Sequence, residues 1–470
     1  MTRELWRAAE IAAATGAEAH GDWAVAGVSI DSRTVKPGEL FIALRGPNHD
    51  GHAFVRDALA RGTAALVDHV PAGLTEQGSL IVVDDTMAAL AALGRAARHR
   101  TGARIAALTG SVGKTGTKEA LRLALAAQAP THASAASHNN HWGVPLSLAR
   151  APRETVYGIF ELGMNAPGEI AALARLVRPH VALITTVEAA HLGFFSSVEA
   201  IADAKGEIFQ GIEPGGVAVL NADNAHYARL RTLAETAGCA RVIGFGATAS
   251  AAARLSDAQL DPAGSDVVMT LEGREIAFRI GAPGRHWVRN ALGVIACTAA
   301  LGADAEVTAR ALADFSALAG RGRQHRLTVS GGAITLIDDS YNANPASVRA
   351  ALEVLGNVTG RKLAALGDML ELGDHTPRLH AELALPITTC GIDRVYTAGP
   401  AMRHLHDALP SARRSVHVDD AAELLPVIEA ELRPGDTLLV KGSLGMRMGT
   451  IVEALLTRPE PARRVAGRRR

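Results

Sequence analysis

The 470-residue sequence has few cysteines and no long apolar run. Its three cysteines, Cys239, Cys297 and Cys390, are odd in number and far apart, which excludes a disulfide framework and a CxxC metal site. No run of about 18 apolar residues occurs, so we predict no transmembrane helix, and the N-terminus lacks a signal-peptide pattern. We therefore expect a protein of the reducing cytoplasm without stable membrane insertion.

The sequence also has no net charge, because 48 basic and 48 acidic residues cancel. This balance argues against nucleic-acid binding, which needs an excess of cations to displace counterions. The charge is uneven along the chain, since residues 458–470 carry six arginines and one glutamate. We interpret this run as a basic, disordered tail on a mildly acidic body.

Lysine is scarce, with only six among the 48 basic residues. Where any solvated cation is sufficient, this chain uses arginine. The lysines are therefore candidates for positions that need a compact ammonium or a primary amine. They are Lys36, Lys114, Lys118, Lys205, Lys362 and Lys441.

The composition, 48% apolar and 20% charged, is that of a globular protein, and the length predicts about three domains. Short apolar runs alternate with segments of helical spacing, which predicts α/β units with parallel sheets and right-handed crossovers. We assign a small α/β unit to residues 1–98, a central P-loop-type unit to 99–320, and a Rossmann-like unit to 321–457.

The strongest motif is TGSVGKTGTK at residues 109–118. A buried strand is expected to end here and a helix to begin, so that glycines and free N–H groups can receive a phosphate. By the P-loop pattern, Lys114 would contact the β- and γ-phosphates and Thr115 would hold Mg²⁺. Two residues instead of four separate Gly110 from Gly113. The motif predicts nucleotide binding but does not specify the reaction.

Five further residues could carry chemistry, and most have a plainer alternative role. Glu161 ends an apolar strand, where a carboxylate for Mg²⁺ or a surface turn is expected. His191 follows another apolar run, as a ligand or a hydrogen-bonded structural residue. Lys205 lies in a helical stretch, and its amine can add CO₂ to become a carbamate, which arginine cannot do. His286 and Asn290 share a helical face, for a ligand or for packing.

Residues 338–345, DDSYNANP, place polar side chains and a proline directly after an apolar strand. In an open α/β sheet this is the position of a ligand site, and a plain turn is the alternative.

Together these segments resemble a known family. The sequence is similar to the Mur ligases over nearly its whole length apart from the tail, and most similar to the branch that adds D-alanyl-D-alanine to UDP-N-acetylmuramoyl-tripeptide. DSYNANP is the most specific motif, and the DYAHTP-like and DNPR-like runs of the diaminopimelate- or lysine-adding relatives are absent. The motifs occur in the family's order: TGSVGKTGTKE, GIFELGMNAPGEI, AAHLG, ADAKGEIF, HWVRNALG, GRGRQHR, DDSYNANP and LGDMLELG.

The resemblance implies a role for each matching position. Residues near the ATP phosphates would be Gly110, Ser111, Gly113, Lys114, Thr115, Gly116 and Thr117. Metal ligands would be Thr115, Glu161, His191 and Lys205 as a carbamate. Catalytic roles would fall to Lys114, Lys205, His191 and Arg321, the last reaching the γ-phosphate. Other nucleotide-facing residues would be His286, Asn290, Asp339, Asn342 and Asn344.

Substrate contacts are implied in two places. Asn139 and Asn140 would face the reacting end of the substrate. The UDP-recognition region would comprise Ser32, Arg33, Asn48, His49, Asp50, Gly51 and His52. The sequence departs from the family at Val112 and Gly116, where asparagine and threonine are usual, and in GPNHDGH, which replaces GExxDGH.

The implied activity is amide-bond formation by a monomer that uses ATP and two Mg²⁺ ions. The reaction would join UDP-N-acetylmuramoyl-tripeptide to D-alanyl-D-alanine through an acyl phosphate. The alternatives are a tripeptide-forming Mur ligase, a ligase like folylpolyglutamate synthase, and, from another class, a regulatory P-loop NTPase.

Overall fold

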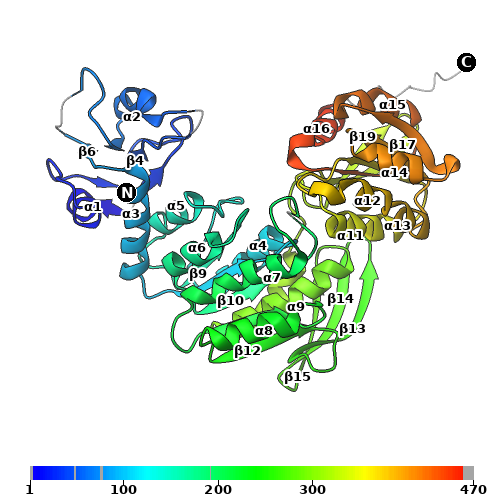
Figure 1. Ribbon diagram of the computed structural model, residues 1–470, viewed down its shortest axis with the longest axis horizontal. Helices are drawn as coiled ribbons and strands as arrows, with labels where there is room; N and C mark the ends of the chain where they lie inside the picture. The colour runs from blue at the N-terminus through cyan, green and yellow to red at the C-terminus, as the bar shows by residue number, and fades with distance from the viewer. Residues whose placement is uncertain (1–3, 47–48, 75–77, 191, 459–470) are drawn as a thin grey trace, which may run out of the picture.

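The computed structural model describes residues 4–46, 49–74, 78–190 and 192–458. The basic tail predicted at residues 458–470 lies outside this part except for Arg458, which pairs with Glu429 at 3.5 Å. Figure 1 shows three lobes that follow one another along the chain, with the first (blue) and third (orange to red) rising from a central green lobe. The first lobe holds a four-stranded sheet, the central lobe a nine-stranded sheet and the third a six-stranded sheet.

In the first lobe, four short strands pair in chain order, β3-β4-β5-β6, and all are parallel. Their residues are mainly apolar and buried, as expected of parallel strands covered on both faces. The elements are β1 (Trp6–Arg7), α1 (Ala8–Thr15), β2 (Ala24–Val25), β3 (Gly27–Ser29), β4 (Glu39–Ile42), α2 (Val55–Ala60), β5 (Ala64–Val67), β6 (Leu80–Val82) and α3 (Thr86–Arg100).

The central sheet has the order β15-β14-β13-β12-β11-β10-β7-β9-β8. Its first elements are β7 (Arg104–Thr109), α4 (Lys114–Ala126), β8 (Thr131–Ala133), α5 (Gly143–Ala149), β9 (Tyr157–Glu161), α6 (Glu169–Val177), β10 (Val181–Ile184) and α7 (Val198–Gly206). Then come β11 (Val217–Asn221), α8 (Tyr227–Thr236), β12 (Arg241–Gly246), β13 (Ala253–Asp261), β14 (Gly264–Leu271), β15 (Arg274–Ile280), α9 (Arg285–Ala300) and α10 (Ala305–Ala311).

The third sheet has the order β16-β17-β21-β18-β19-β20. Its elements are β16 (Arg323–Val329), β17 (Gly332–Asp339), α11 (Pro345–Gly356), β18 (Lys362–Gly367), α12 (Thr376–Ala381), α13 (Ala384–Thr389), β19 (Arg394–Ala398), α14 (Met402–Ala408), β20 (Arg414–Val418), α15 (Leu424–Glu431), β21 (Thr437–Lys441) and α16 (Gly449–Thr457).

The α/β class is confirmed, and the structure adds antiparallel strands to the predicted parallel sheets. In the central sheet β14 pairs antiparallel with both β13 and β15, and in the third sheet β16 pairs antiparallel with β17. These strands are joined by tight turns, which leave no room for a crossover helix. The first predicted boundary, at residues 98 and 99, falls inside α3.

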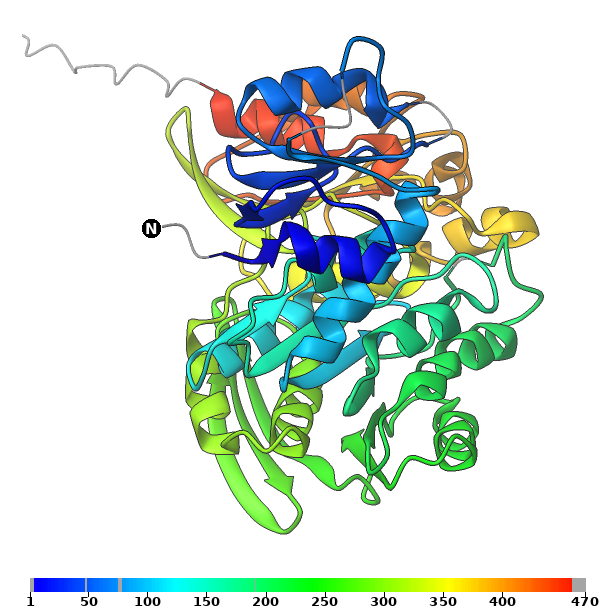
Figure 2. The same ribbon diagram turned by 90° about the vertical axis from the view of Figure 1, so that its left-hand side faces the viewer.

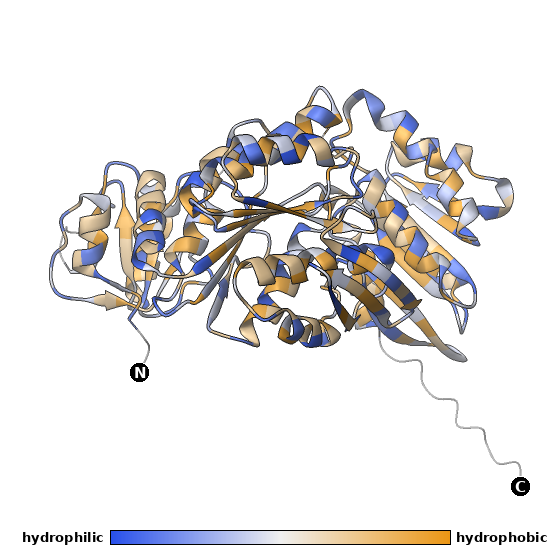
Figure 3. Cartoon of the chain, turned by 90° about the horizontal axis from the view of Figure 1, so that it is seen from below, coloured by the Kyte–Doolittle hydropathy of each residue, from blue (hydrophilic) through white to orange (hydrophobic). Residues whose placement is uncertain are grey.

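Strand β7, in the parallel part of the central sheet, is buried on both faces because its side chains alternate between two cores. Ala106 and Leu108 belong to the core beneath α4 and α9, whereas Ile105 and Ala107 belong to the core beneath α6 and α7. Figure 3 shows the resulting pattern, with hydrophobic strands between layers of helices. Across the described part of the chain, we find no helix with the length and apolar character needed to cross a bilayer.

Helix α3 fixes the first lobe to the central one and is seen running between them in Figure 2. The Asp85 carboxylate caps its first turn by accepting from the backbone N–H of Met87 at 2.7 Å. Near the other end, the buried Arg98 guanidinium donates to the carbonyl oxygens of Val177 and Arg178, both at 2.7 Å. The junction is therefore hydrogen-bonded as well as packed.

We predict that Arg98→Met destabilises this junction. The substitution leaves two carbonyl oxygens without their charged donor, at a cost of about 2–3 kcal/mol. The matched control is Arg95→Met, because Arg95 is exposed on the same helix. Thermal unfolding should show a midpoint several degrees lower for Arg98→Met and unchanged for Arg95→Met, and equal midpoints would contradict the assignment.

Candidate active site

A cleft of about 570 Å³ lies between the central and third lobes. The central wall is formed by the loop before α4, the segment after β8 and the end of β9, and the other wall by the loops around β17 and β21. Most of the predicted nucleotide residues are among its lining. They are Ser111, Gly113, Lys114, Thr115, Glu161, His286, Asn290, Arg321, Asp339, Asn342 and Asn344, together with Asn139 and Asn140.

The phosphate loop is held in shape by residues that follow β10. The Thr185 hydroxyl donates to the carbonyl oxygen of Val112 at 2.6 Å, and the Ser111 N–H donates to Thr186 at 2.9 Å. Gly110 and Gly113 have φ angles of +153° and +87°. A Cβ atom at Gly110 would lie 1.9 Å from the Thr185 hydroxyl oxygen. These glycines are thus required by the backbone conformation and by the protein's own packing.

Lys114 begins α4 and faces the cleft. Its ammonium donates to the carbonyl oxygen of Gly110 at 2.6 Å. Burial lowers the pKa of Lys114, an effect that the Glu161 carboxylate opposes and the Arg321 guanidinium adds to. A bound polyphosphate would supply the negative charge that this end of the cleft lacks.

Glu161 ends β9 with a side chain that is 1% exposed. Its Oε1 accepts from the Asn139 amide at 2.8 Å, whereas its Oε2 has no hydrogen-bond partner within the described residues. A buried carboxylate oxygen without a partner is costly, and carboxylate and hydroxyl oxygens are ligands that Mg²⁺ prefers. Glu161, with the buried hydroxyl of Thr115 in the same lining, therefore fits a divalent cation.

Lys205 lies on α7 with 2% of its surface exposed. Its side-chain amine forms no hydrogen bond or ion pair with any residue that the structure describes. Burial, and then the charge of Lys114, hold the pKa of its amine well below the usual value. A neutral buried amine is the form that adds CO₂, so the carbamate prediction stands as a prediction. The other predicted ligand of this region, His191, lies outside the described residues.

The third lobe presents an arginine and an ion pair to the cleft. The Arg321 guanidinium stacks on the Tyr341 ring at 4.1 Å, and the Tyr341 hydroxyl is 2.6 Å from the Ser137 hydroxyl of the central lobe. Asp339 pairs with Lys441 at 2.7 Å. Burial raises the pKa of Asp339, although Lys441 and Arg321 both act to lower it.

Helix α9 brings two predicted residues, His286 and Asn290, to the cleft beside the phosphate loop. A Cβ atom at Gly113 would lie 2.8 Å from the Asn290 amide nitrogen, so the two segments are in close contact. Burial, helped by Arg289 and Lys441, lowers the pKa of His286 to about 4. Its ring is therefore neutral at neutral pH and offers one donor and one acceptor to a ligand.

Two predicted asparagines have a local structural role besides lining the cleft. The Asn344 side chain caps α11 by accepting from the Ser347 N–H at 2.9 Å, and the Asn140 side chain accepts from the Gly143 N–H at the start of α5. The lining also includes Tyr341, Ser137 and Trp287, which sequence reasoning missed. Lys441 was signalled by the scarcity of lysine.

The predicted UDP residues lie in the first lobe, away from this cleft. Arg33 is exposed and forms two parallel bonds with the Asp31 carboxylate, at 2.9 and 2.8 Å. This pairing lowers the pKa of Asp31 to about 2. The carbonyl oxygen of Ser32 accepts from Arg61 at 2.8 Å, and Asn48 lies outside the described residues.

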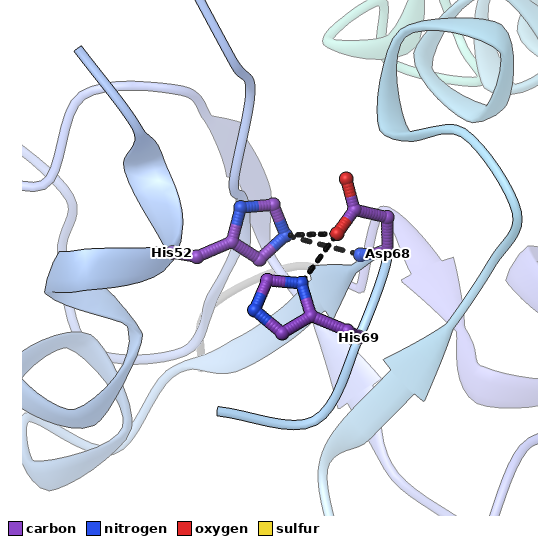
Figure 4. A group of neighbouring side chains, drawn as sticks. All are labelled: His52, Asp68 and His69. Carbon is purple, nitrogen blue, oxygen red and sulfur yellow. Dashed lines mark hydrogen bonds and ion pairs between the residues drawn. The ribbon is translucent and has the colours of Figure 1, made fainter. Parts of the chain in front are cut away.

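Figure 4 shows the cluster around His52, with Asp68 and His69 beside it. His52 Nδ1 is 2.6 Å from Asp50 Oδ1, and His52 Nε2 accepts from the Asp68 N–H at 3.1 Å. Asp68 Oδ1 is 2.5 Å from His69 Nδ1 and 3.0 Å from the Arg45 guanidinium. The arrangement of His52, Asp68 and His69 could hold a metal ion, but Arg45 already supplies the positive charge.

The same cluster shapes the loop predicted to recognise UDP. A Cβ atom at Gly51 would lie 3.0 Å from backbone atoms of Ala43 and Leu44, so the turn is closely packed. His49 is exposed and holds the turn through its carbonyl oxygen, which accepts from the Gly46 N–H at 2.8 Å.

Comparison with known proteins accounts for nearly the whole chain. Residues 24–100 match "Mur ligase family, catalytic domain", residues 108–298 match "Mur ligase middle domain", and residues 322–444 match "Mur ligase, glutamate ligase domain". A UDP-N-acetylmuramoyl-tripeptide–D-alanyl-D-alanine ligase of Rickettsia prowazekii is 34% identical over 450 residues, which cover 96% of this chain and 99% of the relative. The chain belongs to the Mur ligase family.

Two further relatives of this Mur ligase support the same family assignment. A Bacillus subtilis enzyme of the same name is 34% identical, with 92% of this chain and 93% of the relative covered. A crystal structure of MurF from Acinetobacter baumannii superimposes with a TM-score of 0.85 at 30% identity, covering 96% of this chain and 99% of that one. The family resemblance inferred from the motifs is confirmed. The residue assignments stay predictions.

The departure at Gly116 yields a prediction for the phosphate loop of this Mur ligase. A Cβ atom at Gly116 would lie 2.2 Å from the Trp287 ring. Gly116→Ala should force the indole and the helix start apart and weaken binding of a non-hydrolysable ATP analogue about tenfold, since overpacking costs about 1–3 kcal/mol. Calorimetry would measure the dissociation constant.

Two companion variants make this test specific. Trp287→Leu in the Gly116→Ala background should recover most of the affinity, because it removes the clashing ring. Gly102→Ala is the control, since a Cβ atom there meets nothing within 4 Å. Unchanged affinity for Gly116→Ala would show that the loop tolerates the displacement.

Proposed function

We propose that this Mur ligase joins D-alanyl-D-alanine to UDP-N-acetylmuramoyl-tripeptide in a reaction driven by ATP. The observation that carries the proposal is the opposition of Lys114 and Glu161 on one wall of the cleft to Arg321 on the other. The relatives that bear this name span more than nine-tenths of the chain, which supports the same substrates here.

The chemistry needs an activated carboxylate, because a free carboxylate is a poor electrophile. The terminal carboxylate of the tripeptide would attack the γ-phosphate, giving an acyl phosphate and ADP. The amine of D-alanyl-D-alanine would then attack the carbonyl carbon and expel phosphate. Lys114 and Arg321 would stabilise the phosphate charge as it moves, and loss of either should cost about 10²–10³ in rate.

The residues around Glu161 fit Mg²⁺. Thr115 and Glu161 would hold it, with His191 and a carbamate on Lys205 as the further predicted ligands. When bound, Mg²⁺ neutralises phosphate charge and orients the transferred group. The contribution of the chain itself is to bury Glu161 and, within the part of the chain that is described, to leave its Oε2 without a hydrogen-bond partner.

We propose a monomer as the active unit. We further propose the cytoplasm as its location, where ATP is present. The three cysteines are unpaired, in agreement with a reducing compartment.

Phosphate release from ATP tests the proposed activity. A ligase should release phosphate only when both UDP-N-acetylmuramoyl-tripeptide and D-alanyl-D-alanine are present, with a stoichiometric pentapeptide product seen by mass spectrometry. Tripeptides ending in meso-diaminopimelate and in lysine should be offered side by side. Release that is independent of both substrates would sink the ligase assignment and favour a regulatory NTPase.

Lys205→Arg tests the carbamate. The substitution retains a cation but cannot add CO₂, so we expect at least a hundredfold loss of activity that added bicarbonate does not restore. With ¹³C-bicarbonate, NMR should show a carbamate signal in the unsubstituted enzyme that is missing in Lys205→Arg. Lys362→Arg is the control, because Lys362 lies outside the cleft lining. A fully active Lys205→Arg would refute the carbamate.

A further inference from the structure

Lys118 lies one helical turn after Lys114 on α4, but it is fully buried and outside the cleft lining. Its ammonium donates to the carbonyl oxygen of Ser134 at 2.7 Å and to that of Ala136, and it pairs with Glu119 at 3.1 Å. An ammonium has three N–H donors, and three oxygen partners surround this one. Lys118 is therefore not placed to contact a nucleotide, and its conformation is explained by these three protein partners.

Residues 134–140, which we call the bridging loop, follow β8. Within it Ala136 has a φ angle of +45°, in the region that non-glycine residues avoid. Such a conformation persists only where the surroundings over-determine it. The two carbonyl groups bound by Lys118 lie at Ala136 itself and two residues before it, so the ammonium holds the strained point.

The bridging loop touches both halves of the site. Asn139 donates its amide to Glu161 Oε1 at 2.8 Å, and its carbonyl oxygen accepts from the Gly163 N–H at 2.8 Å. Ser137 meets the hydroxyl of Tyr341, whose ring supports Arg321. The loop thus links the carboxylate suited to a cation with the arginine wall of the third lobe.

We propose that Lys118 is a positioning residue that acts through the bridging loop. By holding the strained backbone, it directs Asn139 to Glu161 Oε1, leaves Oε2 available to a divalent cation, and places Ser137 for contact with Tyr341. The inference rests on the proposed function only in that Glu161 serves as the cation ligand. An arginine fork cannot aim three donors from a single nitrogen, which explains a lysine in a chain that otherwise uses arginine.

The first test is amide hydrogen exchange of the free enzyme, which requires no substrate. Lys118→Met removes the ammonium at similar length, and Lys118→Gln keeps a single polar group if the methionine variant folds poorly. Amides of residues 134–143 should exchange at least about tenfold faster in both variants, because local opening becomes easier. The control is Lys362→Met, whose lysine also donates to a carbonyl oxygen, that of Gly356 at 2.6 Å. Folded variants with unchanged exchange in the loop would overturn the proposal.

The second test asks whether Lys118 and Asn139 act on Glu161 by the same route. The measurement is the Mg²⁺ concentration at half-maximal binding of a non-hydrolysable ATP analogue. Lys118→Met and Asn139→Leu should each raise it about tenfold, the size expected for loss of one hydrogen bond to a charged group. The double variant should then lie close to the worse single one. Effects that multiply would show independent roles and overturn the proposal. Neither test uses the peptide substrates, so failure of the ligase assignment would be seen separately.

Discussion

Uncompensated charge buried at the junction of two lobes is the constraint on which the rest of the structure depends. Lys114 is within electrostatic reach of both Lys205 and Arg321, and Glu161 keeps one carboxylate oxygen without a hydrogen-bond partner among the described residues. In a low-dielectric site, such groups destabilise the protein when no ligand is bound, and they interact strongly with a ligand of opposite charge. The scaffold must therefore hold them rigidly, and the hydrogen bonds around the phosphate loop and the bridging loop do this.

Much of the fold could be predicted from the sequence because its signals are local. The apolar runs of β5, β11 and β21 and the helical spacing of α3 follow from side-chain periodicity alone. The strand-to-helix junction at Lys114 was likewise predictable, because the glycines and the GKT sequence that mark it are neighbours in the chain. The antiparallel hairpin β14–β15 was not, because short alternating segments do not reveal their pairing partner.

The site could be predicted only in part, because local sequence does not reveal which distant residues come into contact. The positions of Glu161 and Asp339 at strand ends place them at one edge of their sheets, where ligands bind. The contacts that orient them come from residues far away in sequence, such as Asn139 for Glu161 and Lys441 for Asp339. Gly116 looked like a departure from the family, and its reason, the Trp287 ring, lies on another helix. A single sequence carries no signal for such pairs.

The two outer lobes are attached in different ways, and this difference bears on how the site works. The first lobe is fixed by the Arg98 contacts of α3, by Arg150 donating to Val28, and by Trp6 donating to Ala149. The contacts between the third lobe and the central one include hydrogen bonds between loops. The Ser137 hydroxyl meets the Tyr341 hydroxyl, and the Gly193 N–H donates to the carbonyl oxygen of Glu371. If the UDP group of the substrate binds the first lobe as predicted, the attachment of that lobe would hold it at a fixed distance from the phosphate loop. The third lobe carries Arg321, and the bridging loop is a part of the central lobe that contacts Tyr341, the residue on which Arg321 stacks.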